Sequence, residues 1–96
     1  MYEKLRVLVV DDFATMRKII VNILKQMRFK EIYQADDGTT ALEVLKKEKI
    51  DLILSDWNMP KMNGLELLKQ VRSNPEWNEV KFVMVTAESQ KQNVME

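Results

Sequence analysis

The chain has 96 residues, with 15 Lys and Arg against 15 Asp and Glu, so its formal net charge is zero. A chain of this length buries enough surface for one hydrophobic core, and we expect one domain over residues 1–96. Without a basic excess to neutralise phosphates, neither a nucleic acid nor a membrane surface is expected as a partner. The absence of Cys and His excludes disulfides, thiol catalysis and imidazole chemistry.

The hydrophobic pattern also indicates where the chain acts. Its longest apolar runs have four residues, Val7 to Val10 and Phe82 to Val85, which is too short for a membrane span. The N-terminal residues include Glu3 and lead directly into Asp11-Asp12, unlike a secretory signal. We therefore expect a cytoplasmic protein whose chemistry uses carboxylates, hydroxyls, amines and backbone groups.

The first predicted strand, Leu5 to Val10, is nearly continuously apolar and rich in β-branched residues. Such a sequence is typical of a strand that is buried on both faces of a parallel sheet. An amphipathic helix follows, with Asp12 as its expected N-cap. Apolar residues at steps of three and one predict its buried face: Met16, Ile19, Ile20, Ile23, Leu24 and Met27.

The same strand–helix unit then repeats. Further strands are predicted at Ile32 to Ala35, Leu52 to Ser55 and Lys81 to Thr86. Asp37-Gly38 predicts a turn, and the helices between these strands are predicted to bury Ala41, Leu42 and Leu45, then Leu65, Leu68 and Val71. The second of these helices should begin near Asn63-Gly64 and end at Asn74-Pro75, and a fourth helix should follow Ser89. This alternation predicts a parallel sheet with right-handed crossovers.

Polar side chains follow three of these strands. Asp11 and Asp12 come after the first strand, Asp56 after the third, and Thr86 closes the fourth. The carboxyl ends of parallel strands form the ligand crevice of such sheets, so the carboxylates should converge if the first and third strands are neighbours. Clustered carboxylates repel one another and favour a hard cation, which predicts Mg²⁺. Considered alone, Asp12 could be an ordinary helix cap and not a ligand, and Thr86 could be an ordinary hydroxyl at the end of a strand.

Three segments carry a family resemblance. Val7 to Asp12 reads VLVVDD, Ser55 to Pro60 reads SDWNMP and is followed by Met62-Asn63-Gly64, and Val85 to Ala87 reads VTA. These motifs resemble the receiver domains of bacterial two-component response regulators, and within them the chemotaxis regulators. The resemblance covers the whole chain. It implies a flavodoxin-like, doubly wound parallel sheet of strand order 2-1-3-4.

The resemblance also implies roles for single residues. Asp56 would be the phosphoacceptor, and Thr86 the switch hydroxyl that turns toward the phosphoryl group. Asp11 and Asp12 would bind Mg²⁺ together with Asp56 and the backbone carbonyl of Asn58. The partners would be a histidine kinase and the flagellar motor switch. Such a domain signals, and it catalyses only its own phosphorylation and dephosphorylation.

One part of the family pattern is missing from the chain. The fifth strand with its lysine, and the fifth helix, find no match, so we expect a truncated receiver with impaired signalling. A self-associating fragment that does not signal is the main alternative, because strand Phe82 to Val85 would then form an exposed edge, and we expect a homodimer. A small Mg²⁺-dependent phosphohydrolase would need an acid two residues after Asp56, where Asn58 stands, and a flavin module would need a less acidic first loop.

Overall fold

The computed structural model describes residues 4–57, 59 and 61–85 of the chain. In this part, strands and helices alternate as the sequence predicts. Their bounds are β1 Arg6–Val10, α1 Ala14–Gln26, β2 Glu31–Ala35, α2 Gly38–Lys47, β3 Leu52–Ser55, α3 Gly64–Ser73, the short 3-10 helix η2 Pro75–Trp77, and β4 Lys81–Met84. Thr86 and the helix expected after Ser89 lie outside the described residues.

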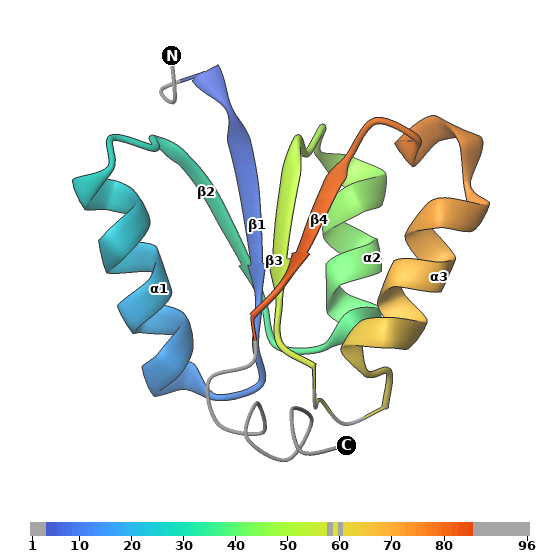
Figure 1. Ribbon diagram of the computed structural model, residues 1–96, viewed down its shortest axis with the longest axis horizontal. Coiled ribbons are helices and arrows are strands. Elements are labelled where there is room, and N and C mark those ends of the chain that lie inside the picture. The colour runs from blue at the N-terminus through green and yellow to red at the C-terminus, as the bar shows by residue number, and fades with distance from the viewer. Residues whose placement is uncertain (1–3, 58, 60, 86–96) are drawn as a thin grey trace.

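All strand pairs in the sheet are parallel, and the strand order is β2-β1-β3-β4. This order confirms the predicted flavodoxin-like topology. Helix α1 covers one face of the sheet, and α2 and α3 cover the other (Figure 1). In the register of β1, Val10 lies opposite Ala35 of β2 and Ser55 of β3, so the residues that follow β1 and β3 leave the sheet side by side.

The hydrophobic core is divided by the sheet into two layers. Strand β1 contributes Leu8 and Val10 to the layer under α2 and α3, and Val7 and Val9 to the layer under α1. All four side chains are at most 1% exposed, which explains the uninterrupted apolar sequence of this strand. No helix in the described part of the chain is long and apolar enough to cross a membrane.

The buried face of α1 differs from the predicted one. Val21 and Leu24 are buried, whereas Ile19, Ile23 and Met27 are 45–50% exposed. The apolar residues span a wider arc of the helix than the sheet covers, and the contact falls on one side of that arc. The predicted inward positions of these three residues are therefore wrong.

Helix α3 begins where the sequence predicts, at Gly64 after an Asn63 N-cap. The Asn63 Oδ1 accepts the Glu66 N–H at 2.9 Å, and the Glu66 Oε1 accepts the Asn63 N–H at 3.1 Å, forming a capping box. The buried side chains are Leu67 and Val71, while Leu65 is 43% exposed. The prediction that Leu65 faces the core is wrong, and Leu67 takes that place.

Candidate metal and phosphoacceptor site

The turn after β1 places two adjacent aspartates in different surroundings. Asp11 is 4% exposed, and its Oδ1 accepts the N–H of Phe13 at 2.9 Å, whereas Asp12 is exposed. The N-cap of α1 is Phe13, which makes no side-chain capping hydrogen bond. The prediction that Asp12 caps this helix is therefore wrong. Its carboxylate is not engaged in capping α1.

Arg17 of α1 fastens this turn to the neighbouring strand. Its Nη1 donates to the backbone carbonyl of Asp11 at 2.6 Å, and its Nε donates to Oε1 of Gln34 on β2 at 3.2 Å. The backbone N–H of Asp11 also donates to the Ala35 carbonyl at 3.1 Å. Strand β2 and helix α1 thus fix the backbone of Asp11, and nothing in the sequence indicates that Arg17 takes part.

Asp56 follows β3 and is fixed by hydrogen bonds along its own backbone. Its N–H donates to the Val10 carbonyl at 2.8 Å, and its Oδ1 accepts the Trp57 N–H at 2.8 Å. The fully buried Ser55 hydroxyl donates to the Asp56 carbonyl at 2.9 Å. Because Asp56 bonds directly to the last residue of β1, it lies next to Asp11 and Asp12.

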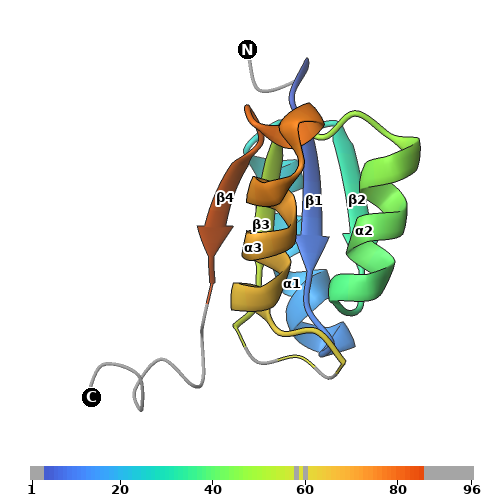
Figure 2. The same cartoon turned by 90° about the vertical axis from the view of Figure 1, so that its right-hand side faces the viewer.

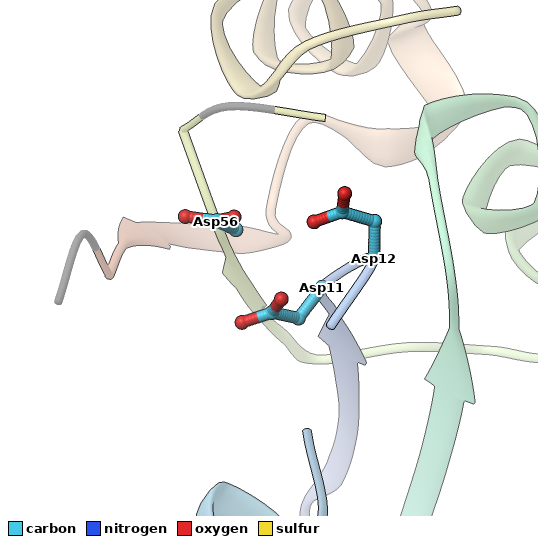
Figure 3. Close-up of side chains that lie close together, drawn as sticks. All are labelled: Asp11, Asp12 and Asp56. Carbon is cyan, nitrogen blue, oxygen red and sulfur yellow. The ribbon is translucent and has the colours of Figure 1, made fainter. Parts of the chain in front are cut away.

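The three carboxylates meet at one point beyond the carboxyl ends of β1 and β3 (Figure 3). One carboxylate oxygen from each of Asp11, Asp12 and Asp56 lies within 4.8 Å of the other two. At an effective dielectric near 20, each pair of negative charges at such a distance repels by about 3 kcal/mol. The all-oxygen donor set and the concentrated charge fit a hard cation such as Mg²⁺.

The start of α3 lies beside the residue that follows Asp56. The Gly64 N–H donates to the Trp57 carbonyl at 2.8 Å, which ties the start of α3 to the residue after Asp56. Met59 within this loop is buried, while Trp57 is 37% exposed. Asn58, the expected carbonyl ligand, and Thr86, the expected switch residue, both lie outside the described residues.

A further carboxylate, Asp37, caps the N-terminus of α2. It is 5% exposed and accepts hydrogen bonds from the Thr39 hydroxyl at 2.6 Å and from the backbone N–H groups of Thr39 and Thr40. The Thr39 hydroxyl bond is the main reason why the pKa of Asp37 lies below its usual value, although burial opposes it; the backbone bonds and the charge of Lys61 also lower it. Asp37 therefore has a structural role as the N-cap of α2. The sequence pattern predicts a turn at Asp37-Gly38 but not this capping role.

Comparison with known proteins identifies the family. The family model described as the response regulator receiver domain matches residues 7–96. The chain belongs to the response regulator receiver family. This membership confirms the resemblance seen in the sequence motifs, and it agrees with the strand order of the sheet.

Several chemotaxis proteins are similar to this receiver. It is 43% identical to chemotaxis protein CheY-3 of Vibrio cholerae, over 98% of this chain and 72% of that protein. It is 44% identical to chemotaxis protein CheY of Pseudomonas aeruginosa, over 96% and 74% of the two chains. The solved structure of the chemotaxis response regulator CheY4 of Vibrio cholerae superimposes with a TM-score of 0.80 at 34% identity, covering 93% of this receiver and 75% of that chain.

Proposed function

We propose that this receiver accepts a phosphoryl group on Asp56 from a histidine kinase and that its phosphorylated form controls flagellar motor rotation. The observation that supports this most directly is the convergence of the Asp11, Asp12 and Asp56 carboxylates within 4.8 Å. The similarity to chemotaxis proteins of the CheY type supports the pathway and a cytoplasmic location.

In this proposal Asp56 is the nucleophile. One of its carboxylate oxygens forms a bond to phosphorus, the bond from phosphorus to the donor nitrogen breaks, and the electron pair leaves with the donor. The Trp57 N–H, which bonds to Oδ1 in the structure, orients the carboxylate. The Thr86 hydroxyl would then donate a hydrogen bond to the phosphoryl group and report its presence.

Asp11, Asp12 and Asp56 would hold Mg²⁺ together with the backbone carbonyl of Asn58. When bound, the ion supplies positive charge that offsets the negative charge of the carboxylates and of the transferring phosphoryl oxygens. The chain's own contribution is to keep Asp11 and Asp56 at fixed positions through the backbone bonds to Ala35 and Val10.

A phosphorylation assay with a matched control tests the proposal. The chain is incubated with Mg²⁺ and a small acyl phosphate, and the modified residue is located by mass spectrometry. We expect slow labelling that is confined to Asp56, none in Asp56→Asn, and retention in Asp36→Asn, which alters an exposed aspartate outside the cluster. Labelling that persists in Asp56→Asn, or no labelling of the folded parent, would contradict the proposal, and continuous release of phosphate would favour a phosphohydrolase.

We also propose that this chain forms a homodimer through β4. Among the described residues, no strand pairs with β4 on the side away from β3 (Figure 2), so its backbone groups there can pair with a second chain. Val83 on this strand is 46% exposed. Two copies with zero net charge do not repel each other, and two identical edges can pair about a twofold axis.

A further inference from the structure

Gly64, the first residue of α3, is buried against the peptide that follows Asp56. A Cβ atom at this position would collide with the Asp56 backbone carbonyl oxygen. It would also lie 2.7 Å from Sδ of Met84 and 3.2 Å from Cα of Trp57. Because protein interiors are packed as densely as organic crystals, any side chain at position 64 forces one of these neighbours to move.

Space, and not backbone conformation, is what requires glycine here. No glycine in the described part of the chain has a positive φ, so the backbone of Gly64 is open to any residue. Alanine is also favoured over glycine within helices. By local preference alone, Gly64→Ala should be tolerated or even stabilising, so a harmful effect would report on the neighbours.

Of these neighbours, Met84 can yield and the Asp56 peptide cannot yield easily. The long side chain of Met84 can adopt another rotamer. The Asp56 peptide is held by the Ser55 hydroxyl at its carbonyl and by the Val10 carbonyl at its N–H. Relieving the collision would therefore distort the short segment that carries the Asp56 carboxylate.

We propose that Gly64 is a positioning residue for the Asp56 carboxylate. Without a side chain, it lets the first turn of α3 pack directly on the Asp56 carbonyl, and its own N–H fixes the Trp57 carbonyl at 2.8 Å. These two contacts act on the peptides before and after Trp57, and the first of these peptides adjoins the Asp56 Cα from which the carboxylate extends toward Asp11 and Asp12. The inference rests on the proposed metal-binding role of this cluster.

Isothermal titration with Mg²⁺ tests this role against a stability control. Residues that orient metal ligands typically change metal affinity by about 10–100-fold when mutated, and we expect Gly64→Ala to weaken Mg²⁺ binding by about tenfold or more. Val71→Ala removes a fully buried side chain from the same helix, away from the cluster, and should lower the melting temperature while keeping the parent's affinity. Parent-like affinity in Gly64→Ala, or an equal loss in Val71→Ala, would overturn the proposal.

A double variant separates the two nearest neighbours. If the Asp56 carbonyl is the obstacle, Gly64→Ala combined with Met84→Ala should remain as weak a Mg²⁺ binder as Gly64→Ala alone. Full recovery of affinity would assign the effect to Met84 and overturn the role of the Asp56 peptide.

Two further measurements test the role of Gly64 if Gly64→Ala does not fold or if the parent does not bind Mg²⁺. If Gly64→Ala does not fold, Ser55→Ala removes the bond at the same carbonyl without adding atoms, and parent-like Mg²⁺ affinity in that variant would overturn the inference. A parent that binds no Mg²⁺ would refute the proposed function instead. The metal-free amide chemical shift of Trp57, whose N–H bonds to the Asp56 Oδ1, then decides: it should move in Gly64→Ala and stay constant in Val71→Ala.

Discussion

Asp11 and Asp12 are neighbours in the sequence but differ in what they contribute to the protein. Asp11 is buried and bonds to the N–H of Phe13, so its removal would damage the turn as well as the cluster. Asp12 is exposed, and within the described structure it makes no helix-capping bond. Asp12 is therefore the position at which charge can be removed with the least disturbance to the fold.

We expect Asp12→Asn to weaken Mg²⁺ binding and to raise the melting temperature of the metal-free protein. Loss of one of three clustered charges removes much of the attraction for the ion, and it also removes charge repulsion within the metal-free cluster. Fluorescence of the adjacent Trp57 follows the Mg²⁺ titration, and thermal unfolding in a chelator follows stability. A variant that binds Mg²⁺ as tightly as the parent would show that Asp12 is not a ligand.

Asp37 should make stability depend on pH in the acid range. Its folded-state pKa is lowered, chiefly by the Thr39 hydroxyl bond, so its contribution is complete above the ordinary carboxyl pKa and is lost as pH falls through the lower folded value. Asp37→Ala should cost about 1–2 kcal/mol at pH 7, as N-cap losses do, and the difference from the parent should shrink below about pH 4.

Urea unfolding across this pH range measures the Asp37 effect, and two variants serve as controls. Asp37→Asn keeps a capping side chain and should lose less stability than Asp37→Ala. Thr39→Val removes the hydroxyl bond that is the main cause of the lowered pKa of Asp37. This variant should therefore show a weaker dependence of stability on pH. A difference between the parent and Asp37→Ala that stays constant down to pH 2 would contradict the assignment.

At the level of the helices, periodicity predicts that a face is apolar but not which part of it is buried. The apolar arc of α1 is wider than its contact with the sheet, and the neighbouring strands determine that Val21 and Leu24 lie inside and Ile23 outside. The same limit applies to Leu65 and Leu67 of α3. Strand bounds were more predictable, because β1 and β3 are short apolar runs that end at aspartates.

The burial difference on α1 predicts unequal costs for two similar substitutions. Leu24→Ala should cost about 2–4 kcal/mol of unfolding free energy, because it leaves a cavity against β1. Ile23→Ala should cost well under half as much, because Ile23 is already 50% exposed. Urea denaturation of both variants compares them directly, and equal losses would mean that Ile23 is covered in solution.

The candidate site shows the same division between what sequence can and cannot predict. Asp11, Asp12 and Asp56 could be grouped in advance, because parallel topology brings the ends of β1 and β3 together. Arg17 and Gly64 could not, since their contacts depend on how α1 and α3 pack against the turns. A lone arginine on a helix and a glycine at a helix start are too common to indicate such roles.

For the molecule as a whole, one side of β4 pairs with no other strand in the described part of the chain, and this predicts concentration-dependent assembly. We expect light scattering at micromolar concentration to show a dimer, and Val83→Lys on the edge strand to shift it toward monomer because a charge there opposes strand pairing. Leu65→Lys, at a similarly exposed position on α3, is the matched control and should leave the dimer intact. A parent that is monomeric at this concentration would refute the homodimer.

The complete burial of strand β1 has a consequence for its register against the neighbouring strands. With apolar side chains on both faces, Val7 to Val10 could slide along its neighbours by two residues and still bury hydrophobic groups. The exposed Asp12 opposes such sliding, because its carboxylate could not enter the dry interior of the sheet without a large desolvation cost. The charge that follows β1 thus helps to fix the register of the strand. Inserting or deleting one residue in β1 would shift Asp11 and Asp12 by about 3.3 Å relative to Asp56 and exchange the faces of the sheet, so folding and ion binding would fail together.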